Sequence, residues 1–291
     1  MAIHPVAALP DVCQRAFPQA IKNFRSYLLA DKGLSPNTAI VYSRMLAKLL
    51  EDIGTETPTL QQYREHLADL RARKYSHTHI TNTCRVIEAY TSMQGEMIPF
   101  ARGRRYSTSV VESLSEGEVA IILNACQGTR EKAVVSILAY SGMRNEELCQ
   151  LRVADIRMGE HMIVIKNGKG NEGRAVRVSA KCIGDIRDYL SDYPRQDDEL
   201  LFVSLKRQLP FEGSTIRRMV RRIVARTRIA KKVSPHIFRH SLAVNMLSRG
   251  ANIFAIKEIL GHSRVGTTLL YLRSVDPKAT TQYELFCPSY S

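Results

Sequence analysis

The chain has 291 residues, which at about 100–200 residues per domain predicts one large domain or two ordinary ones. Hydrophobic residues make up 44% and charged residues 24%, and these near-average values exclude a disordered or collagen-like chain. Lys and Arg number 42 against 28 Asp and Glu, and the resulting net charge of +14 favours a polyanionic partner such as nucleic acid. The alternative is a basic protein with a solvated surface.

Several other classes are disfavoured by the residue pattern. Apolar runs are only a few residues long, so we expect no transmembrane helix. The first residues lack the basic and apolar regions of a secretory signal. The six cysteines form no C-x-x-C pair and are typical of reduced cytosolic thiols that mostly fill the core. No histidine lies at ligand spacing from them, so we expect no metal site. The cysteine pattern, together with the lack of a secretory signal, predicts a cytoplasmic protein.

The first hundred residues predict four short helices that form a compact helical domain. A Ser-Pro pair at 35–36 is typical of the N-cap and first turn of the second helix, and Gly54 ends that helix. The third covers residues 59–72 and places Leu60 on its inward face, and the fourth follows Ser76.

Residues 97–111 differ in composition and predict an exposed basic linker between two domains. The segment contains three arginines, Arg102, Arg104 and Arg105. Two domains joined in this way could close around a rod-shaped anion. The alternative is an ordinary solvated loop.

The second part of the chain mixes helices with a hairpin. Ser115 and Glu118 form a capping signature, and helices are expected over residues 119–125, 131–141 and 145–151. Residues 161–165 and 174–178 then predict two strands, and the turn between them contains Lys169.

A strongly amphipathic helix begins at Thr215, with apolar residues at i, i+3, i+4, i+7 and i+8. Its other face is basic and contains no acidic residue, which favours a phosphate-binding surface over a merely solvated one. The basic residues on the helix are Arg217, Arg218, Arg221 and Arg222.

Two helix starts could bind an anion. Gly142 ends one helix and Arg144 begins the next, so the guanidinium lies beside helix N-terminal amides, with Glu147 one turn on to orient it. His236 and Arg239 follow a Ser-Pro pair and share one face, where an imidazole and a guanidinium could grip an anion and move a proton. Either pattern alone is equally typical of an ordinary helix start or a surface turn.

Three further residues carry polar chemistry at marked positions. Lys169 in its glycine-rich turn could act as a point charge or proton donor, or be only a turn residue. His262 directly follows Gly261, which caps a helix over residues 253–260. Tyr271 lies nine residues beyond His262, and alone it could be a core aromatic with its hydroxyl at the surface.

Taken together, these motifs resemble the tyrosine recombinases, also called the phage integrase family. GMRNEEL resembles the first arginine box, NGKGNEGRAVRV the lysine hairpin, and SPHIFRHSLAVNML with LGHSRVGTTLLY the second box. The resemblance implies a mainly α fold with a small β-hairpin or sheet, made of a helical, SAM-like core-binding domain and a mixed α+β catalytic domain. It further implies the division 15–96, linker 97–111, catalytic domain 112–275 and C-terminal tail 276–291.

The resemblance also implies the chemistry. Tyr271 would attack a DNA phosphate and form a 3′-phosphotyrosine, without ATP or a metal ion. Arg144 and Arg239 would stabilise the charge of the transition state, and Lys169 would protonate the leaving 5′-oxygen. The remaining roles would be proton transfer from Tyr271 by His236, a hydrogen bond to phosphate from His262, and support of Arg144 by Glu147.

The simple two-domain form most resembles Xer-type recombinases and short resolvases. The implied partners are double-stranded DNA with a specific core site and a homotetramer on two duplexes, with a second recombinase or accessory protein also possible. The tail could pack on a neighbouring protomer or fold back on its own domain. Lys166 and Arg174 flank the hairpin and are expected to touch backbone phosphates, and His240 is expected to be structural. Two alternatives remain: a DNA-binding regulator without catalysis, and a relaxing enzyme like type IB topoisomerases.

Overall fold

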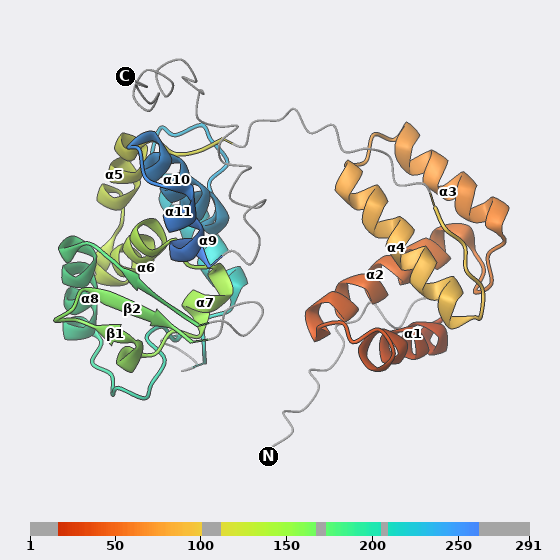
Figure 1. Cartoon of the computed structure of the whole chain (residues 1–291), viewed down its shortest axis with the longest axis horizontal. Coiled ribbons are helices and arrows are strands. Elements are labelled where there is room, and N and C mark those ends of the chain that lie inside the picture. Colours follow the sequence, from red (N-terminus) through yellow and green to blue (C-terminus); the bar gives the residue numbers. More distant parts are fainter. Residues whose placement is uncertain (1–16, 101–111, 167–172, 205–208, 262–291) are drawn as a thin grey trace, which may run out of the picture. The chain divides into compact units, whose positions relative to one another are not determined.

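The computed structural model describes residues 17–100, 112–166, 173–204 and 209–261. The chain divides into two compact units, Met1–Thr108 and Ser109–Ser291 (Figure 1). In the described residues, both units are built mainly from helices, and the second also contains a small sheet. None of the described helices is long and apolar enough to cross a membrane.

The first unit is a bundle of four helices with its own core. Serine and threonine side chains cap three helix starts, including Ser35, and Gly54 at φ 83° ends the second helix. Phe24 and Tyr90 meet edge to face in the core, with ring centroids 5.6 Å apart. The helices are α1 (Pro18–Ala30), α2 (Pro36–Ile53), α3 (Leu60–Ala72) and α4 (His77–Met93).

One expectation for this unit is wrong in detail. Leu60 is the first residue of α3 and is 37% exposed, because the first turn of the helix projects beyond the core that Tyr63 and Leu67 enter. The bounds of α2 and α3 and the start of α4 lie within a residue of the predicted ones.

The second unit is organised around α6, which is buried on nearly all sides and packs against α8, α9 and α10 (Figure 1). Its helices are α5 (Glu116–Asn124), α6 (Gly128–Ser141), α7 (Asn145–Cys149), α8 (Ala180–Asp192), α9 (Gly213–Val224), α10 (Pro235–Ser248) and α11 (Ile253–Leu260), with a 3₁₀ turn, η2 (Val153–Asp155).

The sheet of the second unit has three antiparallel strands in the order β1-β2-β3. β2 and β3 form the predicted hairpin, in which Ile163 pairs with Val176 and Ile165 with Arg174. β1 and α8 are not among the elements predicted from the sequence. The strands are β1 (Ile156–Arg157), β2 (Met162–Ile165) and β3 (Arg174–Arg177).

Candidate active site

The turn between α6 and α7 brings Arg144 close to the end of α11. Gly142 ends α6 at φ 59°, and a Cβ added there would lie 2.7 Å from Leu260 Cδ2 and 2.9 Å from Leu242 Cδ2. Only glycine therefore allows both this backbone conformation and this packing. Two residues on, Arg144 is the N-cap of α7.

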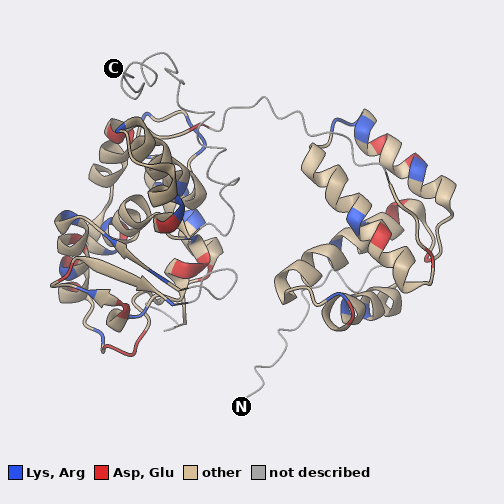
Figure 2. Ribbon diagram, viewed as in Figure 1, with Lys and Arg blue, Asp and Glu red and all other residues tan. Residues whose placement is uncertain are grey.

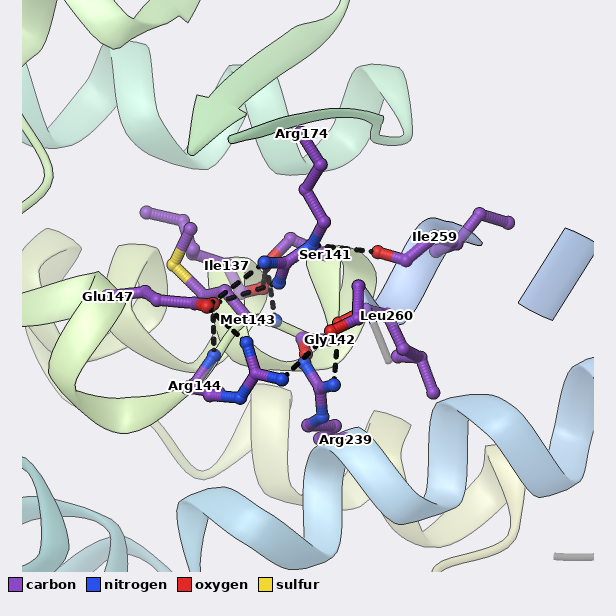
Figure 3. Close-up of polar contacts among 11 residues, drawn as sticks. Ile137, Ser141, Gly142, Met143, Arg144, Glu147, Arg174, Arg239, Ile259 and Leu260 are labelled. Carbon is purple, nitrogen blue, oxygen red and sulfur yellow. Dashed lines mark hydrogen bonds and ion pairs between the residues drawn. The ribbon is translucent and has the colours of Figure 1, made fainter. Parts of the chain in front are cut away.

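Arg144 is held by an acidic side chain and a main-chain carbonyl (Figure 3). Its Nη1 donates to Glu147 Oε1 at 2.7 Å and its Nη2 donates to Gly261 O at 2.9 Å. The side chain of Arg144 keeps 27% of its surface exposed. The guanidinium is thus fixed in direction and still open to solvent, as an anion-binding group should be.

Arg239 reaches the same place from α10. It is 2% exposed, and it donates from Nη1 to Gly142 O at 2.7 Å and from Nη2 to Leu260 O at 2.5 Å. Because Leu260 and Gly261 are adjacent, the two guanidiniums lie side by side at the C-terminal end of α11 (Figure 3). The structure therefore brings together two arginines that are 95 positions apart in the sequence, at 144 and 239.

His236 lies one turn before Arg239 on α10, near the N-terminus of that helix. Surrounding protein atoms lower the pKa of its imidazole, and the positive charges of Arg239 and Arg144 lower it further. The residue as a whole is nevertheless exposed to solvent. An accessible imidazole that is neutral at pH 7 can accept a proton. His240, by contrast, is buried at 3% exposure.

Glu147 is the acidic centre of the site. It is 7% exposed and accepts hydrogen bonds from the Arg144 side chain and, at 2.7 Å, from the Arg144 main-chain N–H. Burial alone would raise its pKa. The hydrogen bonds from Arg174 and from the Arg144 main chain outweigh burial and hold the pKa of Glu147 at about 2. Glu147 is therefore ionised, and it supports Arg144 at the position the sequence predicted.

Arg174 corrects an expectation. Its side chain is only 9% exposed and all three guanidinium nitrogens bind protein groups, so it is committed to the protein rather than to DNA phosphates. It binds Glu147 with two hydrogen bonds, of 3.0 and 2.8 Å, and donates from Nε to Ile259 O at 3.0 Å. The prediction failed because Glu147 lies 27 positions away, and no local pattern announces such a contact. Lys166, the other flank of the hairpin, pairs with Asp155 at 2.5 Å.

The basic helix α9 has the predicted two faces. Four of its apolar residues are buried: Ile216, Met219, Val220 and Ile223. The four arginines are exposed. Arg222, however, forms an ion pair of 2.8 Å with the buried Glu131 of α6, and Arg226 forms another of 2.5 Å. Part of the basic surface therefore holds α9 against α6. Figure 2 shows how Lys and Arg are distributed over the ribbon.

Several predicted functional residues lie outside the described residues: Lys169, His262, Tyr271, Arg102, Arg104, Arg105 and the tail 276–291. Their places in the chain can still be stated. Lys169 belongs to the connection between β2 and β3, and His262 directly follows the Gly261 that receives Arg144. The chain thus leads from the arginine site straight into the segment that contains Tyr271.

The described residues include several cysteines and other side chains of the types that hold metal ions in other proteins. Among these described residues, no group of three or more His, Cys, Asp or Glu side chains could hold a metal ion. Cys84, Cys149 and Cys182 are buried, as predicted for core residues. Burial raises the pKa of the Cys182 thiol to about 12, which makes this sulfur unreactive.

Comparison with known proteins identifies the family. The model of the phage integrase family matches residues 112–277. The chain is 32% identical to the tyrosine recombinase XerA of Pyrococcus furiosus, over 88% of this chain and 89% of the relative. It is 26% identical to XerD of Staphylococcus aureus, over 92% and 98%.

Solved structures agree. A XerA recombinase crystal structure matches with a TM-score of 0.55 and 29% identity, over 94% of this chain and all of that one. The Tn1549 transposon integrase, in complex with a circular intermediate DNA, shares the fold with a TM-score of 0.74 at 19% identity, over 92% and 99%. The chain therefore belongs to the phage integrase family and is a tyrosine recombinase.

Proposed function

We propose that this recombinase cuts and rejoins DNA at a specific site, with Tyr271 as nucleophile and Arg144, Lys169, His236, Arg239 and His262 as the other catalytic residues. One observation carries the proposal most directly. Arg144 and Arg239 come from different helices and bind neighbouring carbonyls, Gly261 O and Leu260 O. Two adjacent guanidiniums suit the two non-bridging oxygens of one phosphodiester, where negative charge grows in the transition state.

The reaction begins with attack of the Tyr271 oxygen on a DNA phosphorus atom. The bond to the 5′-oxygen breaks, and a 3′-phosphotyrosine forms, which keeps the energy of the phosphodiester for rejoining. A tyrosine with a pKa near 10 is mostly protonated at neutral pH, so its proton must be removed. His236 receives it, and its lowered pKa keeps the imidazole neutral and ready. Lys169 protonates the leaving 5′-oxygen, and His262 donates a hydrogen bond to a phosphate oxygen.

Rejoining reverses these steps with the 5′-hydroxyl of a partner strand, which yields a Holliday junction after the first exchange and recombinants after the second. Neither ATP nor a metal ion is needed. The family match and the XerA relatives favour this function over the two alternatives, a regulator without catalysis and a relaxing topoisomerase.

DNA binding is supported by the charge of the chain and by the neighbours in fold, which include a lambda integrase dimer bound to a core site. We assign phosphate contacts to Arg217, Arg218, Arg221 and Arg222 of α9 and to Arg102, Arg104 and Arg105 of the linker. These contacts position the protein on the duplex and do not read the sequence.

The proposed organisation is a core-binding domain at 15–96, a linker at 97–111, a catalytic domain at 112–275 and a tail at 276–291. Four copies assemble on two duplexes, with the tail of each packed on a neighbour. An accessory protein or a second recombinase could share the assembly. The protein works in the cytoplasm, at the nucleoid.

A suicide substrate tests the proposal. DNA nicked beside a candidate site from the flanks of the gene traps the covalent intermediate, which is seen as a slow band on a denaturing gel. The wild type should form this band without metal or ATP, and Tyr271→Phe should abolish it. Tyr283→Phe is the matched control, because it removes a hydroxyl from the same C-terminal segment, and it should keep the band. Tight, specific DNA binding without any band would instead support the non-catalytic regulator.

A further inference from the structure

The C-terminal end of α11 is held by three arginines from three different elements. Arg174 of β3 donates to Ile259 O at 3.0 Å, Arg239 of α10 to Leu260 O at 2.5 Å, and Arg144 at the start of α7 to Gly261 O at 2.9 Å. Three consecutive carbonyls therefore each receive one guanidinium, and Figure 3 labels the first two of the residues that carry them, Ile259 and Leu260. These carbonyls form the negative end of the helix, where cations are most strongly attracted.

Arg174 is the member of this trio without an assigned role. It differs from the other two in what else it binds, because it grips both oxygens of Glu147, at 3.0 and 2.8 Å. Glu147 in turn orients Arg144. Arg144 is held by Glu147 and by the carbonyl of Gly261 at the end of α11. Arg174 contacts both Glu147 and the end of α11, and so connects these two supports.

Arg174 also packs tightly against Gly261 at the end of α11. Gly261 has φ 63°, and a Cβ added there would lie 2.8 Å from Arg174 Cδ and 3.1 Å from Arg174 Nη1. The Arg174 side chain therefore lies directly against the main chain of Gly261. The next residue in the sequence is His262.

We propose that Arg174 is a positioning residue for strand cleavage, which fixes Glu147 and the end of α11 so that Arg144 points at the scissile phosphate. Arg174 binds Glu147 and Ile259 O with Nε, Nη1 and Nη2, and it acts through Arg144. This inference rests on the proposed function for its effect on cleavage, and on the contacts above for its effect on α11.

The physical reason is geometric. Without Arg174, Glu147 keeps a single side-chain partner and no longer shares its charge between two arginines, so Arg144 can move toward it. The end of α11 also loses the bond at Ile259 O. A displacement of about 1 Å in a group that binds the transition state can lower a rate about 100-fold.

The first test measures single-turnover formation of the covalent adduct at saturating suicide substrate. Arg174→Met should slow it about 100-fold, and Arg174→Lys, which keeps the charge but not the paired hydrogen bonds, about tenfold. Arg177→Met is the matched control, since it removes the same charge from the exposed face of the same strand. It should leave the rate within twofold. The Kd for DNA of Arg174→Met should stay within threefold of this control.

A structural role alone could slow cleavage, so a second arm asks whether Arg174 acts through Arg144. In an Arg144→Lys background, Arg174→Met should slow the adduct less than threefold further, because the group that it positions has been replaced. The same 100-fold loss in both backgrounds would overturn the inference, as would a wild-type rate in Arg174→Met.

A third arm does not depend on cleavage. Amide hydrogen exchange of residues 253–261 in the free protein should be about tenfold faster in Arg174→Met than in Arg177→Met. Arg174→Lys serves here if the Met variant does not fold. Unchanged exchange would overturn the inference whatever the gel shows. Absence of an adduct from the wild type would instead defeat the proposed function and leave the result on α11 standing.

Discussion

Two buried glutamates of the second unit, Glu147 and Glu131, each bind two arginines and a main-chain N–H at a helix start. Their arginines differ in surroundings. The partners of Glu131 are 63% and 25% exposed, whereas those of Glu147 are 27% and 9% exposed. Only the latter pair also binds the carbonyls that end α11.

The same local pattern therefore has two uses in the second unit. At Glu131 the ion pairs connect α6 to the basic helix α9, and their arginines can still be solvated. At Glu147 the ion pairs direct two guanidiniums toward one helix end, and one of the two, that of Arg174, is almost buried. An acidic residue with two arginines does not by itself mark an active site. At Glu147 the carbonyls at the end of α11 also bind the two arginines, and this additional contact sets the direction of their guanidiniums.

The largest expected difference follows from removing each carboxylate. Glu147→Ala leaves Arg174 almost buried without its counter-ion, and we expect the free energy of unfolding to fall by about 3–5 kcal/mol. Glu131→Ala should cost about 1–3 kcal/mol, since its arginines can reach water. Denaturant unfolding measures both. Adduct formation should fall about 100-fold in the first variant and remain unchanged in the second. Equal losses in the two variants would remove the distinction.

Acid should weaken the Glu147 site in a defined window. Its pKa is about 2 in the folded protein against 4.5 ordinarily, so the carboxylate stabilises the fold above about pH 4.5, and this contribution is lost as the pH falls toward 2. The shift corresponds to about 3 kcal/mol. The stability difference between wild type and Glu147→Gln should shrink by this amount from pH 6 to pH 2. A difference that does not change with pH would show that the carboxylate is not specially stabilised.

A smaller effect separates backbone strain from packing. Gly261→Ala and Gly54→Ala both place a side chain at positive φ, 63° and 83°, but only at Gly261 would the new Cβ meet Arg174. We expect Gly54→Ala to lower the free energy of unfolding by about 1 kcal/mol and Gly261→Ala to lower it by about twice as much. The melting temperatures of the two variants measure this difference. Only Gly261→Ala should slow cleavage. Equal melting temperatures would mean that Arg174 moves aside without cost.

The smallest expected effect is a shift in the titration midpoint of the His236 imidazole. Its imidazole should titrate below 6.5 in an NMR experiment, because surrounding protein and the charges of Arg239 and Arg144 oppose protonation. Arg144→Met should raise the midpoint by removing one of these charges, and Arg177→Met should not move it. A midpoint at or above 6.5 in the wild type would contradict the lowered pKa of His236.

Much of the fold could be predicted from local signals. Ser35, Thr59 and Ser76 mark helix starts through their side-chain caps, and Gly54 and Gly261 mark helix ends through their positive φ. These features depend on a few neighbouring residues. The strand β1 was missed because two residues carry no period, and only pairing with β2 defines it.

The helix α8 could have been found. Ser179 caps it, and Cys182, Ile183, Ile186 and Tyr189 give it a buried stripe at helical spacing. For the site, the Arg144–Glu147 contact could be predicted because it spans one turn of the chain. The Arg174–Glu147 contact could not, since only tertiary folding brings the start of β3 to α7.

The entry of the chain into the second unit has a practical consequence for cutting the protein into fragments. Leu114 is fully buried, its N–H donates to Ser241 Oγ at 2.7 Å, and its carbonyl accepts from Asn245 Nδ2 at 3.2 Å. Lys231 adds bonds to Ser113 O and to Glu118. A fragment that starts at Val119 would lack Leu114 and its contacts, and would expose the side of α10 that Leu114 covers. An isolated second unit should therefore be expressed from residue 112 or earlier.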